Sequence, residues 1–206
     1  SLAAPEEILL DLNGLAEGHQ FMGLGVFQVS DDGRLLAYST DTTGFRAYTL
    51  MVKDLDTGAV VAGPIEKCGA VAWAADNRTL FHTTEDAAKR FHRLWRLEVG
   101  GAGQLVYQED DERFRVSVER TRSRRHLLVH LDSHTTSELR LLPAENPTAE
   151  LRLLVGRVQD RELSAEHLGD GWLLRVNDTG PGFRVVLLAE TDFRPDHWTE
   201  LLPHRE

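Results

Sequence analysis

The sequence predicts an all-β protein, a β-propeller of about four four-stranded blades. Short runs rich in Leu, Val, Phe and Tyr alternate with clusters of Gly, Asp, Asn and Pro, which is the pattern of strands joined by turns. Two kinds of marker residue recur with a period of about 45 residues, typical of a propeller blade. A blade cannot cover both of its faces alone, so blades stack around an axis.

The first marker is an acidic residue that closes one strand of each repeat. With spacings of 44, 47 and 46 residues, it occurs at Asp41, Glu85, Asp132 and Asp178. The second marker is an apolar anchor in the following strand. With spacings of 44, 45 and 46 residues, it occurs at Leu50, Leu94, Leu139 and Val185.

These markers divide the chain into four predicted blades, at about residues 21–66, 67–110, 113–157 and 160–203. Ahead of them, residues 6–12 are expected to be the last strand of a preceding blade. The chain is therefore expected to be a piece of a larger propeller. A β-sandwich is the alternative, but it does not predict a spacing that holds through four repeats. A parallel α/β sheet would need crossover helices, which the sequence lacks.

Turn signals and apolar runs place four strands in each blade. In the first blade, the turns are Asp31-Asp32-Gly33 and Asp56-Thr57-Gly58, because Asp-Gly supplies the positive backbone angle of a tight hairpin. The strands of this blade are expected at residues 26–30, 34–40, 48–55 and 59–66. The later strands are expected at residues 70–74, 79–84, 92–99, 104–109, 115–120, 126–132, 137–143, 149–155, 163–168, 172–178, 184–190 and 197–203. Only residues 13–20 and 85–90 show a helical pattern.

The composition is that of a folded, acidic protein. Of the 206 residues, 41% are hydrophobic, and 23 Lys and Arg against 33 Asp and Glu give a net charge of -10, which disfavours nucleic acid as a partner. The single cysteine, Cys68, excludes an internal disulfide and fits a reducing compartment, so a cytoplasmic protein is expected. No apolar run reaches the roughly 18 residues of a membrane span. The first five residues show neither a signal-peptide pattern nor an initiator Met, which indicates a trimmed segment.

No catalytic, cofactor-binding or metal-ligating residue is predicted. A serine nucleophile commonly sits on a G-x-S-x-G elbow, and that pentapeptide does not occur in the sequence. His126, His130 and His134 are four residues apart, but in a strand this spacing spans about 13 Å, too far for neighbouring pairs to bind one zinc ion. We interpret these histidines as polar residues of a sheet face and a turn.

Two charged clusters have a structural and a functional interpretation. The basic cluster consists of Arg120, Arg122, Arg124 and Arg125. We favour a solvated hairpin in the third blade, with an anion or partner contact and interblade ion pairs as alternatives. Residues 109–112 are all acidic; we favour a solvated linker between blades, with attraction of a cationic peptide as the alternative.

Several stretches resemble the propeller of the prolyl oligopeptidase family of serine peptidases. They are residues 9–13 (LLDLN), 15–18 (LAEG), 30–39 (SDDGRLLAYS), 44–46 (GFR) and 48–50 (YTL). Within that family the oligopeptidase B (protease II) group is the most similar. The stretches that resemble it are residues 73–81 (WAADNRTLF), 111–114 (DERF), 123–125 (SRR), 135–138 (TTSE) and 200–206 (ELLPHRE).

This resemblance implies a seven-bladed propeller joined to an α/β-hydrolase domain. The chain would hold the last strand of blade one and then blades two to five, and the hydrolase domain would be absent from it. The catalytic Ser, Asp and His belong to that domain, so none is assigned to a residue here. The resemblance also implies that the propeller caps the active site, admits only short peptides and partners its own hydrolase domain, in an enzyme that cleaves after Arg and Lys and therefore takes short basic peptides.

The first strand of a blade normally lines the central tunnel. This gives five candidate tunnel-facing residues: Gln28, Arg115, Ser117, Glu119 and Glu166. The alternative function is a standalone propeller scaffold that binds protein partners, although the G-H…W-D signature of WD repeats is absent. An opened ring leaves blade faces uncovered, so we also expect the separate chain to self-associate, most simply as a two-fold dimer.

Overall fold

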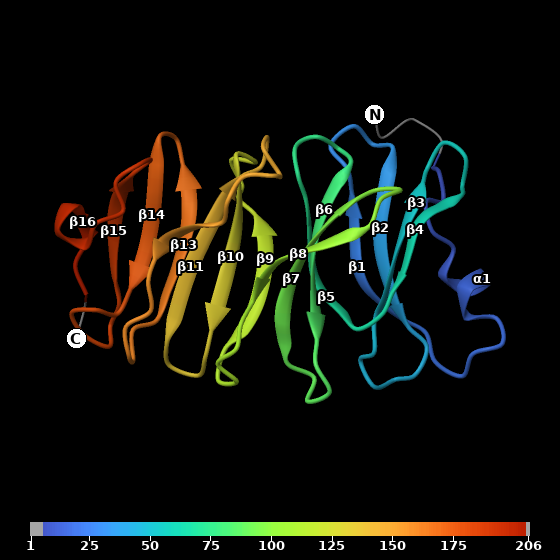
Figure 1. The fold of residues 1–206 in the computed structure, drawn as a ribbon, viewed down its shortest axis with the longest axis horizontal. Helices are drawn as coiled ribbons and strands as arrows, with labels where there is room; N and C mark the ends of the chain where they lie inside the picture. Colours follow the sequence, from blue (N-terminus) through green and yellow to red (C-terminus); the bar gives the residue numbers. More distant parts are fainter. Residues whose placement is uncertain (1–5, 205–206) are drawn as a thin grey trace. The chain divides into compact units, whose positions relative to one another are not determined.

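The structure is a computed structural model that describes residues 6–204. Within this range the chain forms sixteen strands, arranged as four antiparallel sheets of four strands each (Figure 1). Helical structure is confined there to α1 (Leu12–Ala16) and the 3₁₀ turn η1 (Pro195–His197). The predicted fold class, all-β with about four four-stranded blades, is confirmed. Neither helical segment of these residues has the length and apolar character needed to cross a bilayer.

Each sheet is a meander in which hairpins join strands that are neighbours in the sequence. The first sheet contains β1 (Gly23–Val29), β2 (Leu35–Asp41), β3 (Thr49–Asp54) and β4 (Val60–Ile65). The second contains β5 (Cys68–Trp73), β6 (Thr79–Glu85), β7 (Phe91–Glu98) and β8 (Gly103–Gln108). The third contains β9 (Arg115–Arg120), β10 (His126–Asp132), β11 (Ser137–Pro143) and β12 (Arg152–Val155). The fourth contains β13 (Leu163–Leu168), β14 (Gly171–Val176), β15 (Arg184–Ala189) and β16 (Thr199–Leu202).

The apolar marker residues keep their expected places in three of the four sheets. Leu50, Leu94 and Leu139 are fully buried in the third strand of their sheets. In the fourth sheet the fully buried residue is Val186 rather than the predicted Val185. In the regular ladder with β14, Val186 stands opposite Leu174, which is also fully buried, so the buried face of β15 begins one residue later than predicted.

A second repeated feature is a hydrogen bond between the first and second strands, which occurs within the first sheet and again within the second. Ser39 on β2 accepts a hydrogen bond at 2.9 Å from the backbone N–H of Val26. Thr83 on β6 accepts one at 2.9 Å from the N–H of Ala70. Both pairs are therefore equivalent, and they carry the same spacing as the marker residues.

The N-terminal segment differs from the expectation. Residues 6–11 form no strand, and no described strand pairs with them, whereas Leu12 begins α1. Asp11 caps that helix, because its carboxylate accepts hydrogen bonds from the N–H groups of Asn13 at 2.9 Å and Gly14 at 3.2 Å. Residues 86–89 form a turn rather than a helix. Residues 1–5, where the sequence shows no signal-peptide pattern, and the last two residues of the 200–206 stretch lie outside the described residues.

The two predicted aspartate-glycine turns are present. Gly33 and Gly58 adopt φ angles of +76° and +75° in the loops that precede β2 and β4. This left-handed conformation costs glycine little, because it has no Cβ. Gly33 N–H also donates to the Ser30 carbonyl at 2.9 Å, which closes the hairpin between β1 and β2.

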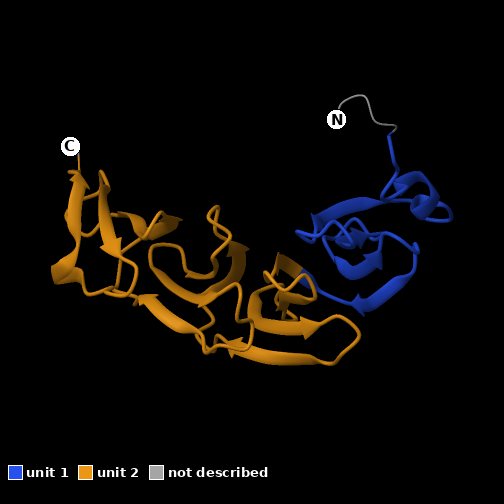
Figure 2. Cartoon of the chain, turned by 90° about the horizontal axis from the view of Figure 1, so that it is seen from above, with its two compact units in different colours: residues 1–68 blue, residues 69–206 orange. Residues whose placement is uncertain are grey.

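The chain divides into two compact units, Ser1–Cys68 and Gly69–Glu206 (Figure 2). In the second unit, both faces of the third sheet are covered. Leu127, Val129 and Leu131 pack in one apolar cluster with residues of the second sheet, including Phe81. Leu128 packs in another cluster with residues of the fourth sheet, including Trp172. Alternate residues of β10 therefore serve two cores, which explains its nearly continuous apolar sequence.

Close packing within the second sheet predicts that Gly69→Ala destabilises the chain by about 1–3 kcal/mol. A Cβ at this position would lie 2.6 Å from Cε1 of Phe91 and 2.8 Å from Oγ1 of Thr83, so the ring and the hydroxyl would have to move. Urea unfolding monitored by circular dichroism measures the loss. Gly103→Ala is the matched control, because its Cβ would meet its nearest neighbour only at 4.0 Å. Equal stability of both variants would contradict the prediction.

Candidate functional site

The candidate tunnel residues lie on the first strands of their sheets. Arg115, Ser117 and Glu119 share the exposed face of β9, where strand alternation buries Val116 and Val118 on the other face. Gln28 on β1 is exposed, and Glu166 on β13 is half-buried. Their assignment to a tunnel stays a prediction.

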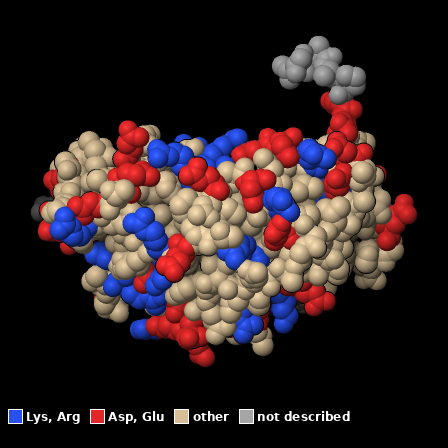
Figure 3. All heavy atoms as spheres, turned by 45° about the horizontal axis from the view of Figure 1, so that its top comes forward, with Lys and Arg blue, Asp and Glu red and all other residues tan. Residues whose placement is uncertain are grey.

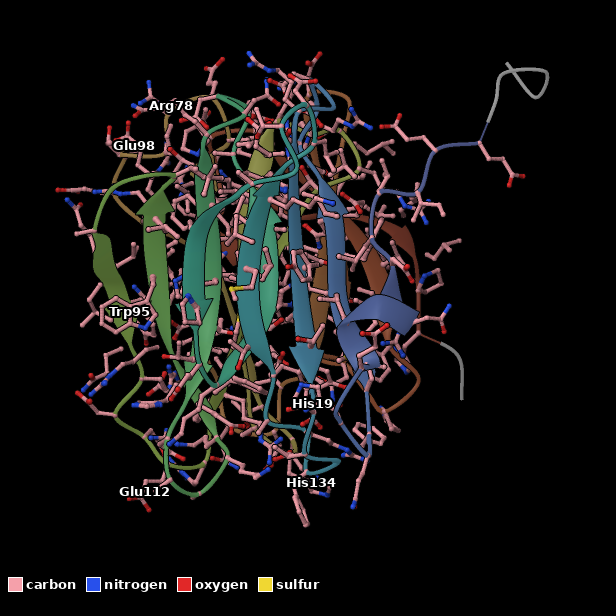
Figure 4. The ribbon with its side chains drawn as sticks, turned by 90° about the vertical axis from the view of Figure 1, so that its right-hand side faces the viewer. His19, Arg78, Trp95, Glu98, Glu112 and His134 are labelled. Carbon is pink, nitrogen blue, oxygen red and sulfur yellow. The ribbon has the colours of Figure 1, made fainter. Side chains whose placement is uncertain are left out.

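The three regularly spaced histidines do not converge. His130 Nε2 lies 2.8 Å from Oε1 of Glu119, one of the tunnel candidates. His134 lies exposed in the loop after β10 (Figure 4). His126 is buried at the start of β10, 8% exposed, and faces residues of the fourth sheet instead.

The arginine cluster lies in the hairpin between β9 and β10, as predicted. The side chain of one of its members contacts the next sheet. Arg125 Nη1 donates to the carbonyl of Gly169 at 3.0 Å, and its guanidinium lies 3.6 Å from Glu190. The interblade alternative thus applies to this residue. On the face that Figure 3 shows, acidic and basic side chains are interspersed rather than gathered in one patch.

Residues 109–112 were expected to be a solvated linker, and for Glu109 this is wrong. Glu109 is only 5% exposed and accepts hydrogen bonds from the Tyr107 hydroxyl at 3.0 Å and the Asp111 N–H at 2.9 Å. Glu112, in contrast, is exposed and points away from its loop (Figure 4). The sequence could not separate these two glutamates, because burial depends on a partner from the following sheet.

That partner is Arg157, and the group it organises is called the arginine seam: Tyr107, Glu109, Glu138, Arg140 and Arg157. Arg157 donates from Nη2 to Glu109 at 2.6 Å and from Nε to Glu138 at 3.0 Å. Its guanidinium also lies over the ring of Phe114, 4.0 Å from the centroid. Burial opposes the charge of Arg157, but the hydrogen bonds to the two glutamates outweigh it and raise its pKa.

The same balance acts on the acidic and phenolic groups of the arginine seam. Burial raises the pKa of Glu138, but hydrogen bonds from Arg140 and Arg157 outweigh it, and the pKa is lowered. Burial and the hydrogen bond to Glu109 raise the pKa of Tyr107 to about 12. At neutral pH Glu138 is therefore ionised beside a charged Arg157 and Tyr107 is a neutral phenol, an arrangement that stabilises the contact between sheets.

A second polar group joins the third and fourth sheets and is called the histidine cluster: His126, His167 and Glu190. The Nε2 atom of His167 lies 2.5 Å from Oε2 of Glu190, and Nε2 of His126 lies 3.4 Å from Oε1 of the same carboxylate. Burial, together with the charge of His167, lowers the pKa of His126, and Glu190 opposes this shift only in part. His126 therefore carries an uncharged imidazole at neutral pH.

Ser123 completes a serine–histidine–glutamate chain, because its Oγ lies 2.9 Å from Nδ1 of His167. This order resembles a hydrolase triad, but two features oppose such chemistry. The His167 side chain is fully buried. The Ser123 hydroxyl lies in a β-hairpin and also contacts Thr121 Oγ1 at 3.0 Å and the Arg125 N–H at 3.3 Å, so it is not presented on a strand-to-helix elbow.

A pocket of about 430 Å³ opens beside the histidine cluster. His126 and Glu190 form part of its wall, together with Arg125, Arg152 and Glu145. The pocket thus gives solvent and small solutes access to two of the three residues of the histidine cluster. The sequence analysis missed this group, because its members come from two strands and the loop after a third, and carry no local spacing signal.

The only cysteine, Cys68, is buried, and the sequence offers no second cysteine for an internal disulfide. Burial raises the pKa of its thiol to about 12, so the thiol stays protonated and is a poor nucleophile.

Comparison with known proteins shows the relationship of the chain. Residues 1–206 match the family described as prolyl oligopeptidase, N-terminal β-propeller domain. The uncharacterized peptidase y4sO of Sinorhizobium fredii is 39% identical over 98% of the chain, and the dipeptidyl aminopeptidase BI of Pseudoxanthomonas mexicana is 34% identical over 98%. The solved structure of oligopeptidase B from Trypanosoma brucei, in a closed form with covalently bound antipain, superposes with a TM-score of 0.86 at 30% identity over 97% of the chain.

The chain spans about a third of the length of these relatives. It covers 30% of the Sinorhizobium peptidase, 29% of the dipeptidyl aminopeptidase and 29% of the oligopeptidase B chain. The similarity thus concerns a domain of these proteins rather than their whole length.

Proposed function

Since the chain belongs to the prolyl oligopeptidase N-terminal β-propeller family, we propose that it is the non-catalytic, substrate-gating propeller of an oligopeptidase B-like serine peptidase. The observation that carries the proposal is the family match over residues 1–206 together with four repeated four-stranded sheets. The similarity to oligopeptidase B, at 30% identity, supports cleavage after Arg or Lys in the whole enzyme. The propeller would partner a C-terminal α/β-hydrolase domain and take short basic peptides.

The physical role proposed for this domain is steric. Closed antiparallel sheets are rigid because their strands are paired and their faces packed, so a propeller admits an extended peptide more easily than a folded protein. The polar face of β9, with Arg115, Ser117 and Glu119, is the proposed tunnel surface in the third sheet. Gln28 and Glu166 are proposed for the same role in the first and fourth sheets.

We expect the chain of residues 1–206 to show no hydrolysis of Arg or Lys esters and amides. A continuous assay with and without a serine-directed inhibitor measures this. Inhibitor-sensitive turnover that disappears in Ser123→Ala would overturn the non-catalytic role, because Ser123 is the serine that contacts a buried histidine–glutamate pair.

The whole enzyme encoded by the parent gene tests the specificity. An oligopeptidase B-like endopeptidase should cleave N-acetylated peptides after Arg or Lys and should spare folded proteins. A dipeptidyl aminopeptidase, the activity named for one 34% identical relative, should require a free N-terminus and release dipeptides. Mass spectrometry of matched free and acetylated peptides separates the two, and loss of cleavage on acetylation would contradict the proposal.

The proposal also concerns the compartment of the protein and the self-association of the separate chain. The single cysteine, which is buried and cannot form an internal disulfide, supports a reducing compartment such as the cytoplasm. Self-association of the separate chain stays a prediction, and light scattering over a concentration series checks it.

A further inference from the structure

We propose that His126, His167 and Glu190, the histidine cluster, bind one divalent transition-metal ion, with Zn²⁺ the best match to two imidazoles and one carboxylate. Neither the sequence-based expectation nor the proposed function includes such a site. The ion would join the third sheet, through His126, to the fourth sheet, through His167 and Glu190.

The donor atoms are already close together. One ligand atom from each residue can be chosen so that all three lie within 4.8 Å of one another. Tetrahedral bonds of about 2.1 Å would place neighbouring ligand atoms roughly 3.4 Å apart. The observed separation between Nε2 of His126 and Oε1 of Glu190 is 3.4 Å, which is the spacing of two ligands. Nε2 of His167 and Oε2 of Glu190 are 2.5 Å apart, so these two atoms would have to move apart when an ion binds between them.

The backbone and the surrounding side chains hold these donors in place. His167 lies in the ladder between β13 and β14, one pair before the hairpin and directly opposite Trp172. The ring centroids of His126 and His167 are each 5.0 Å from that of Trp172, which restricts rotation of both imidazoles. Rigid strands of this kind keep ligands in position before a metal arrives.

The second nitrogen of His167 has the partner that a metal-binding histidine needs. Nδ1 lies 2.9 Å from Oγ of Ser123, so it can donate its proton there while Nε2 faces Glu190. When a metal ion replaces the proton between Nε2 and Oε2 of Glu190, such an outer contact holds the tautomer that is protonated at Nδ1. Nδ1 of His126, in contrast, is buried without a hydrogen-bond partner among residues 6–204, so the hydrogen bonds within that range leave Nε2 as the functional end of this ring.

The adjoining pocket supplies an entry path and an open coordination position. Three protein ligands leave a fourth position of a tetrahedral ion for water or another small ligand. His126 and Glu190 line the pocket, so this position would face it. Arg125 and Arg152 in the same wall oppose a bare cation and favour an anionic fourth ligand, such as hydroxide or a carboxylate.

The test uses the full chain of residues 1–206 after treatment with a chelator and dialysis. Zn²⁺ binding is measured by isothermal titration calorimetry, and Co²⁺ binding by its visible absorption and by quenching of Trp172 fluorescence. We expect one metal ion per chain and an absorption band of four-coordinate Co²⁺. Zn²⁺ should also raise the melting temperature, because a ligand that binds only the folded state stabilises it.

Glu190→Gln and His126→Gln should each weaken Zn²⁺ binding by at least about tenfold and remove the rise in melting temperature. His130→Gln is the matched control, because it alters a histidine–carboxylate pair of 2.8 Å that has no second histidine ligand. Circular dichroism without metal verifies that each variant is folded, and Trp172→Phe identifies the quenched tryptophan. Absence of stoichiometric Zn²⁺ binding, or equal binding by the wild type and folded Glu190→Gln, would overturn the proposal.

Discussion

Replacing Trp172 with alanine is expected to lower the free energy of unfolding by about 3–5 kcal/mol. Trp172 is fully buried in the middle of the cluster between the third and fourth sheets, where it packs with Leu128, Leu139 and Leu174. Alanine would leave a cavity that paired strands on both sides cannot close. Urea unfolding monitored by far-ultraviolet circular dichroism measures the loss without depending on tryptophan emission.

Two other substitutions separate cavity formation from the loss of an indole. Trp95→Ala makes the same change at a half-buried position of β7, where the indole N–H donates to Thr84 Oγ1 at 2.9 Å, so a smaller loss of about 1–2 kcal/mol is expected (Figure 4). Trp172→Phe retains a buried ring and removes an N–H that has no acceptor among residues 6–204, so a loss below about 1.5 kcal/mol is expected. The interpretation is wrong if Trp172→Ala is no less stable than Trp95→Ala.

Repetition made the fold predictable. Each blade is a local meander, so strand pairing follows sequence order, and turn residues mark where each hairpin closes. The strands at residues 115–120, 126–132 and 137–143 have the predicted bounds. Residues 6–11 were not predictable in this way, since a strand is defined by its neighbour and no described strand pairs with them.

The face of the sheet on which a side chain lies was harder to predict than the position of the strand. Val185 and Val186 are both apolar and adjacent, and only the pairing with β14, which sets Val186 opposite fully buried Leu174, shows that Val186 is the buried one. The alternation of β9 is clearer, because polar Arg115, Ser117 and Glu119 alternate with Val116 and Val118. A strand with polar alternation thus shows its face in the sequence, whereas a strand apolar on both faces does not.

The polar groups between sheets were the least predictable feature. His126 looked like one of three spaced histidines, but its contacts are His167 and Glu190, which lie on the following sheet. Glu109 looked like part of an acidic linker, but Arg157 lies near the end of the next sheet and pairs with it. No local sequence pattern indicates which side chains contact each other between blades, because those contacts depend on how whole sheets stack.

Arg157→Met is expected to destabilise the chain by about 3 kcal/mol. The substitution keeps an apolar side chain over Phe114 but removes the charge that serves Glu109 and Glu138, whose side chains are 6% and 7% exposed. Two buried carboxylates would then lose a donor each, and the desolvation penalty of those charges would no longer be offset. Urea unfolding at pH 7 gives the free energy directly.

Arg113→Met is the matched control for loss of an ion pair. Arg113 and Asp111 are 2.7 Å apart, but their side chains are 71% and 31% exposed, so a much smaller loss of stability than for Arg157→Met is expected. A double-mutant cycle with Glu138→Gln should show that the two substitutions at the arginine seam are less destabilising together than their sum. Additive effects would mean that Arg157 does not stabilise the chain through Glu138.

The pH dependence of the stability of Arg157→Met gives an independent result. Hydrogen bonds from Arg140 and Arg157 outweigh burial and hold the pKa of Glu138 below its ordinary value of 4.5. A carboxylate with a lowered folded-state pKa contributes stability above the unfolded value, and this contribution is lost as the pH falls through the folded value. The stability difference between the wild type and Arg157→Met should therefore be constant near neutral pH and should shrink as the pH falls below 4.5. A difference that stays unchanged down to the acid transition would show that the charge of Glu138 does not contribute to the stability supplied by Arg157.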